Sequence, residues 1–149
     1  NLLNFASTAV FMLLLVAIAI LVKKAPKSPN IAQISFLILA AFVITNKVYS
    51  PQYVLWLVPL AVLARPNWRD FLIWQFGEVI YFVAIWWFLA GYGIVGSQTL
   101  TPQWYAAAIF VHIAATLYFA IRVAIDTQQD QTINTESNRD VVNRTSART

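Results

Sequence analysis

The first 125 residues of the chain consist of long apolar stretches separated by short polar segments. No Asp, Glu, Lys or Arg occurs within residues 1–22, 28–46, 48–64 or 79–121. Uninterrupted apolar runs of about 18 residues are typical of transmembrane helices. Alternation with a period of two, which would favour strands, is absent, and an α-helix satisfies its own backbone hydrogen bonds in lipid. The pattern therefore predicts an all-α, polytopic membrane protein.

The polar segments divide this region into five predicted transmembrane helices. We expect these helices over residues 5–22, 31–45, 52–64, 71–90 and 103–125. Pro66 is expected to end the third helix, and Asp70 to be the N-cap of the fourth. The five helices would form one transmembrane domain, residues 1–125. Residues 126–149 are rich in Gln, Asn, Thr and Ser and cannot bury enough apolar surface to fold, so we expect a disordered polar tail.

Basic residues are distributed unequally between the two predicted sides of the membrane. If the loops alternate across five spans, Lys47 lies alone on one side and nine basic residues lie on the other. These nine are Lys23, Lys24, Lys27, Arg65, Arg69, Arg122, Arg139, Arg144 and Arg148. Cytoplasmic loops carry the excess of Lys and Arg. We therefore expect a multi-pass plasma-membrane protein with an extracytoplasmic amino terminus and a cytoplasmic carboxyl terminus.

The composition narrows the chemistry that the chain can perform. Hydrophobic residues make up 60% of it and charged residues 11%, and the mean hydropathy is +0.65, which favours a membrane protein over an ordinary soluble domain. The absence of cysteine excludes disulfides, thiolate nucleophiles and Cys-ligated zinc, and a single histidine excludes a multi-His metal site. We expect no metal ion, no cofactor and no nucleic-acid partner.

The polar segment at residues 46–52 is the most informative part of the predicted outer side. The preceding helix of 15 residues is about 22 Å long, which is shorter than the roughly 30 Å hydrocarbon core. Polar non-helical backbone at that depth is tolerated only where it lines a cavity or is buried in protein. One interpretation is an outward-facing pocket that contains Asn46, Lys47, Tyr49, Ser50, Gln52 and Tyr53. The other is an ordinary hairpin turn with Lys47 snorkelling to the headgroups.

Residues 46–60 read NKVYSPQYVLWLVPL. This segment resembles the K-V-x-S-P-Q-Y-x-x-W-x-x-P-L signature of the family 87 glycosyltransferases, integral-membrane enzymes of the GT-C superfamily. The similarity is greatest to actinobacterial mannosyltransferases that use polyprenyl-phosphate mannose. The resemblance implies a GT-C-like bundle that transfers a sugar, mannose in these relatives, from a polyprenyl-phosphate donor to an extracytoplasmic glycan or glycolipid.

The resemblance also implies roles for individual residues. Lys47, with Asn46, Tyr49, Ser50 and Gln52, would bind the donor phosphate, and Tyr53 and Trp56 would stack on isoprenoid or sugar. The family's catalytic carboxylate lies in a first outer loop, and this chain has no acidic residue on its predicted outer side. We therefore expect a carboxyl-terminal membrane fragment that contains no catalytic residue, is inactive alone and requires the remaining amino-terminal part. The missing initiator methionine agrees with that expectation.

Two ionisable residues fall inside predicted spans. Glu78 lies about 10 Å along the fourth helix, one turn from Gln75. A carboxylate at that depth usually faces a bundle interior, so we expect a structural hydrogen bond or a pairing with a base such as Arg122; a proton pathway is the alternative. His112 is expected to form an interhelical hydrogen bond. The neighbouring alanines of the fifth helix would allow close helix packing.

Two further classes of function stay open at this stage. A transporter or channel component would need inverted repeats or paired broken helices, and only one such hairpin is visible. A non-catalytic membrane scaffold would bind no donor and would tolerate substitution of Lys47.

Overall fold

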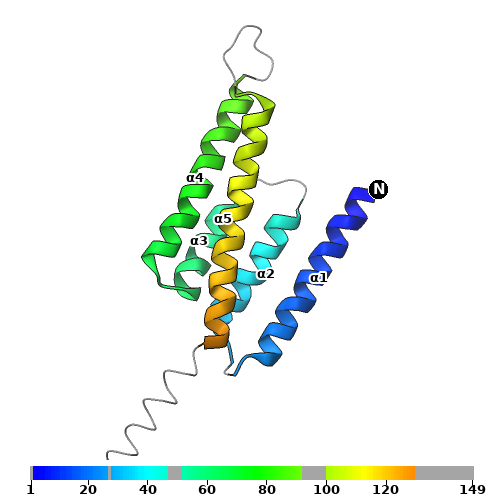
Figure 1. Ribbon diagram of the computed structural model, residues 1–149, viewed down its shortest axis with the longest axis vertical. Coiled ribbons are helices and arrows are strands. Elements are labelled where there is room, and N and C mark those ends of the chain that lie inside the picture. The colour runs from blue at the N-terminus through cyan, green and yellow to red at the C-terminus, as the bar shows by residue number, and fades with distance from the viewer. Residues whose placement is uncertain (1, 27, 47–51, 92–99, 130–149) are drawn as a thin grey trace, which may run out of the picture.

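The computed structural model describes residues 2–26, 28–46, 52–91 and 100–129 of the chain. Within these residues it contains five α-helices and no strand, which confirms the all-α prediction. The helices, shown in Figure 1, are α1 (Leu2–Lys24), α2 (Ile31–Thr45), α3 (Tyr53–Ala64), α4 (Trp68–Ala90) and α5 (Pro102–Gln129).

Three of these helices, α1, α4 and α5, are long and apolar enough to cross a membrane. The other two, α2 and α3, are apolar but contain only 15 and 12 residues. In Figure 1 they end well short of the tip of the α4–α5 hairpin. The predicted five spans are therefore three long helices and a short helical pair.

The start of α4 corrects one prediction. Asn67, not Asp70, is the N-cap, because its side-chain oxygen accepts from the backbone N–H groups of Arg69 at 3.1 Å and Asp70 at 3.4 Å. Both residue types are good N-caps, so residue type alone did not distinguish them. Asp70 instead lies buried in the first turn of the helix.

The end of α5 corrects another prediction. The helix continues through Gln129, four residues beyond its predicted end at residue 125. Its last turns contact the bundle: Asp126 pairs with Arg65, and Gln128 Nε2 donates to the Leu21 carbonyl at 3.1 Å. These contacts stabilise helical backbone in a segment whose composition alone is polar.

The core lies where α2 packs against α3, α4 and α5. Phe36 is its centre, with ring centroids 6.0 Å from Trp74 and 5.1 Å from Phe119, both in edge-on arrangements. All three rings are completely buried, and Leu57 of α3 belongs to the same cluster. Aromatic rings in these orientations add to the stabilisation from burial itself.

A close approach joins α4 to α5 at Gly77. A Cβ atom at this position would lie 2.5 Å from the Ala115 Cβ and 3.4 Å from the Val111 carbonyl oxygen. Small residues at this point let the two backbones approach, as is common between membrane helices.

By contrast, α1 has no buried residue. It contacts α2 through the edge-on pair Phe11–Phe42, with centroids 6.1 Å apart, and through the Ser7 hydroxyl, which donates to the Thr45 carbonyl. The exposed apolar surface of this helix suits contact with lipid.

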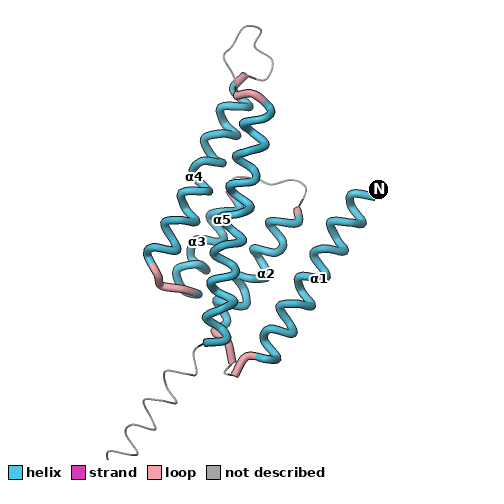
Figure 2. Tube along the Cα trace, viewed as in Figure 1, coloured by secondary structure: helices cyan, strands magenta, loops and turns pink. Residues whose placement is uncertain are grey.

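The polar segments that follow α1 and α3 lie at the same end of the molecule as the last turn of α5 (Figure 2). The chain therefore returns to this end of the molecule after α1, α3 and α5, although α2 and α3 do not reach as far as the tip of the α4–α5 hairpin.

Candidate functional site

The predicted donor pocket falls partly outside the described residues. Lys47, Tyr49 and Ser50 are among the residues that the structure does not describe. On one side of that segment, Asn46 is the half-buried C-cap of α2, and its backbone N–H donates to the Phe42 carbonyl at 2.9 Å. On the other side, Gln52 is exposed at the start of α3 and forms no side-chain cap hydrogen bond.

Two aromatic predicted site residues lie together at the start of α3. The ring centroids of Tyr53 and Trp56 are 5.0 Å apart with planes tilted by 38°. Tyr53 is half-buried against the core, while Trp56 is 53% exposed. The pair therefore offers an amphipathic aromatic surface to whatever lies beside this end of the helix.

Glu78 and His112 form a buried polar cluster between α4 and α5. The Glu78 Oε1 atom accepts hydrogen bonds from the Trp74 indole N–H and the Thr116 hydroxyl, each at 2.9 Å. His112 Nδ1 lies 2.9 Å from the same oxygen, and Tyr81 packs on the imidazole with ring centroids 5.0 Å apart. The Glu78 and His112 side chains are only 3% and 4% exposed. This geometry gives His112 an interhelical hydrogen bond inside the bundle.

The suggested pairing of Glu78 with Arg122 is wrong, because Arg122 contacts Asp70 instead. Gln75, one turn from Glu78 along α4, does not share in the cluster. Its Nε2 atom is buried and has no hydrogen-bond partner among the described residues.

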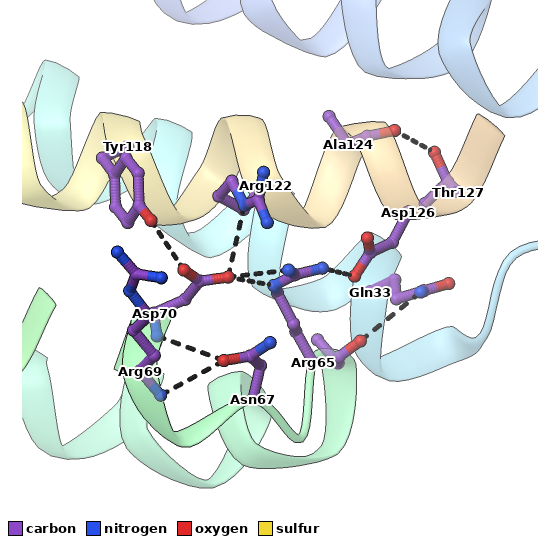
Figure 3. A network of polar contacts seen from close by, with 11 residues as sticks. Gln33, Arg65, Asn67, Arg69, Asp70, Tyr118, Arg122, Ala124, Asp126 and Thr127 are labelled. Atoms are coloured by element: carbon purple, nitrogen blue, oxygen red, sulfur yellow. Dashed lines mark hydrogen bonds and ion pairs between the residues drawn. The ribbon is translucent and has the colours of Figure 1, made fainter. Parts of the chain in front are cut away.

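A second polar network, drawn in Figure 3, joins the segment after α3 to α4 and α5. The Arg65 guanidinium is its centre. Its Nε and Nη2 atoms both donate to Asp70 Oδ2 at 2.7 Å, and its Nη1 atom donates to Asp126 Oδ2. Burial alone would lower the pKa of Arg65, but the hydrogen bonds to the two carboxylates outweigh it and raise that pKa above its ordinary value.

The Asp70 carboxylate also connects directly to α5. Its Oδ1 atom accepts from the Tyr118 hydroxyl at 2.6 Å, and its Oδ2 atom accepts from Arg122 Nε at 3.2 Å. Sequence reasoning missed this network. Its only local signal was an Arg and an Asp five residues apart at a helix start; the partners on α5 lie 48 to 61 residues away in the sequence.

An apolar groove of about 470 Å³ runs between α4 and α5 in the half of the hairpin nearer its tip. Its walls include Val83 and Trp87 of α4 and Trp104, Ala107 and Val111 of α5. Such a groove suits a hydrocarbon chain and contains no group for acid–base chemistry. Among the described residues, no group of three or more His, Asp or Glu side chains is placed to hold a metal ion.

Comparison of the chain with protein families, curated proteins and solved structures found no match.

Proposed function

We propose that this chain is the donor-binding, carboxyl-terminal membrane part of a glycosyltransferase that uses a polyprenyl-phosphate sugar. The observation that carries the proposal is the resemblance of residues 46–60 to the family 87 signature, located at a hairpin of two short helices. By length, α2 spans about 22 Å and α3 about 18 Å, against about 34 Å for α4. The shortness of the pair favours a polar segment below the outer surface of the bilayer.

The chemistry of the donor fits the residues of the signature. The leaving group of the reaction is an anionic lipid phosphate, and a cation with hydrogen-bond donors lowers the barrier where negative charge develops. We assign the cation to Lys47 and the donors to Asn46, Tyr49, Ser50 and Gln52. Tyr53 and Trp56 then supply the aromatic surface for the isoprenoid or the sugar, as their contact at the start of α3 allows.

In this proposal the chain spans the plasma membrane with its amino terminus outside and its carboxyl terminus in the cytoplasm. The sugar is mannose, and the acceptor is an extracytoplasmic glycan or glycolipid. The catalytic carboxylate belongs to another segment of the complete enzyme, so the residues named here bind the donor and perform no proton transfer.

Photocrosslinking tests the proposal with the chain as it stands. The chain is reconstituted in phosphatidylcholine nanodiscs with a polyprenyl-phosphate mannose that carries a diazirine near the phosphate, and crosslinked peptides are mapped by mass spectrometry. We expect labelling concentrated in residues 46–60 and displaced by unlabelled donor. Phosphatidylcholine with the same diazirine serves as the control. Identical labelling by the two probes would instead indicate a membrane scaffold that does not recognise the donor.

A further inference from the structure

Five ionised side chains gather where α4 begins and α5 ends, and we call them the arginine cluster. They are Arg65, Arg69, Asp70, Arg122 and Asp126. Three positive and two negative charges leave one positive charge without compensation. Because a net charge at the edge of a low-dielectric region is costly, the cluster is suited to one bound anion of charge minus one.

Arg65 is not available to such an anion. Its side chain is 10% exposed, and all three of its guanidinium nitrogens donate to Asp70 or Asp126. Its role is to hold the two carboxylates together, and the remaining capacity for an anion lies with the other two arginines.

Arg69 and Arg122 both have unused donors. The Arg69 side chain is exposed and forms no hydrogen bond or ion pair with any described residue. Arg122 donates to Asp70 through Nε alone, and its side chain is 42% exposed. In Figure 3 the two guanidinium groups lie on either side of the Asp70–Tyr118 pair. A phosphate placed there would meet donors from both helices.

The face of α4 that follows Arg69 toward the carboxyl end of the helix is apolar and exposed. Leu72, Ile73 and Phe76 follow Arg69 at intervals of three, four and seven residues, so they share its side of the helix. They are 58%, 44% and 68% exposed. Trp68, 77% exposed at the first position of α4, is of the type that is enriched at membrane interfaces. A headgroup at Arg69 would therefore have its acyl chains on a continuous apolar stripe.

The stripe leads into the apolar groove between the two helices. Val79 lies ten residues beyond Arg69, or about 15 Å along the helix, which is half the thickness of the hydrocarbon core. It lines the groove, and Val111 and Trp104 line the groove on the face of α5 that also contains Arg122. We call the apolar stripe on α4 together with this groove the α4–α5 seam. Both arginines lie at its polar end, and its apolar part can accommodate a hydrocarbon chain.

We infer that Arg69 and Arg122 form a binding site for the phosphodiester of an anionic membrane phospholipid, with its tails on the α4–α5 seam. A phosphodiester carries one negative charge, which neutralises the excess of the arginine cluster. The planar guanidinium group matches the geometry of phosphate oxygens and donates two hydrogen bonds at once. The site is independent of the donor pocket, because it lies at the opposite end of α2 and α3.

Lipid binding to the purified full chain tests the inference. The chain in neutral detergent micelles is titrated with phosphatidylglycerol or phosphatidylcholine, and bound lipids are counted by native mass spectrometry. We expect tighter binding of phosphatidylglycerol, and a loss of roughly fivefold in its affinity in Arg69→Gln. Phosphatidylcholine binding should not change. The melting temperature should change little, because the Arg69 side chain is exposed and forms no hydrogen bond or ion pair with any described residue.

Lys24→Gln is the matched control, since it removes the same charge at the same end of the molecule but from α1. We expect it to weaken phosphatidylglycerol binding less than twofold. Equal losses of affinity in the two variants would show that the lipid is attracted only by the overall positive charge, and would overturn the proposed site. So would equal binding of the two lipids by the unmodified chain. Displacement of phosphatidylglycerol by an equal concentration of inorganic phosphate would show that the tails contribute nothing, and would overturn the assignment to a lipid.

Discussion

Among single residues, Glu78 stands out because one of its carboxylate oxygens, Oε1, contacts polar groups on both α4 and α5. It receives the Trp74 and Thr116 donors and contacts His112, all at 2.9 Å. Three polar groups from two helices thus depend on one buried carboxylate. Without it they would stay buried with fewer acceptors, and a buried donor without an acceptor is costly.

We predict that Glu78→Leu lowers the free energy of unfolding by at least about 2 kcal/mol, since it leaves the Trp74 and Thr116 donors without their shared acceptor. Glu78→Gln is the matched control, because its amide oxygen can still accept, and it should cost less. Thermal unfolding in detergent micelles, followed by circular dichroism, measures both. A leucine variant as stable as the wild type would show that the cluster does not stabilise α4 against α5.

At the scale of helices, the packing of α4 on α5 depends on the absence of a side chain at Gly77. An added Cβ would lie 2.5 Å from that of Ala115, so Gly77→Ala forces the helices apart. We predict a loss of about 1–3 kcal/mol. Gly91→Ala provides the same chemical change at the end of α4, where φ is −93° and acceptable to any residue, and should alter stability little. Equal melting temperatures for the two variants would contradict the close approach.

The end of α5 gives a second test at this scale. Truncation after Gln129 leaves every described contact in place, whereas truncation after Ile125 removes Asp126 from Arg65 and Gln128 from the Leu21 carbonyl. The Arg65 side chain is buried, so losing Asp126 leaves its charge with Asp70 as the one carboxylate partner among the described residues, which is destabilising. We predict that the chain truncated after Ile125 melts at a lower temperature than the full chain, whereas the chain truncated after Gln129 melts at the same temperature. If both truncations melt together, Asp126 contributes nothing to the bundle.

The sequence predicted the helices better than it predicted their contacts. The polar segments that bound the second apolar run predicted α2 at the observed residues, 31–45, and the shortness of α2 and α3 followed from the same spacing. The predicted start of α4 is wrong because Asn67 and Asp70 are both good N-cap residues, and the predicted end of α5 is wrong because its last turn is polar in composition. In the structure Arg65 is buried and forms ion pairs with Asp70 and Asp126. Asp126 is 61 residues away in the sequence, so no local sequence pattern could have predicted this pair.

The orientation of the whole molecule in the membrane can be tested with introduced cysteines. The chain contains no cysteine, so a single introduced cysteine reports its own location without background. We predict that cysteines at Lys27 and Asn67, expressed in intact cells, resist a membrane-impermeant maleimide until the membrane is permeabilised. The reason is the nine-to-one bias of basic residues toward that side. Labelling of either position from outside would show that the orientation is the opposite of the predicted one, with residues 46–52 on the cytoplasmic side.

If Lys47 binds the donor phosphate, as we propose, its substitution should change the affinity of the reconstituted chain for polyprenyl-phosphate mannose. In a partly desolvated site the charge is worth more than the 0–1 kcal/mol or so of an exposed ion pair. We predict that Lys47→Ala weakens binding by a factor of roughly ten to a thousand, or about 1.4–4 kcal/mol. Lys47→Arg should keep part of the affinity, because the charge remains while its shape changes. Lys24→Ala, which removes the same charge from the other predicted side, should bind like the wild type. Wild-type donor affinity in the Lys47→Ala chain would instead show that Lys47 is an interfacial lysine and that the donor phosphate binds elsewhere.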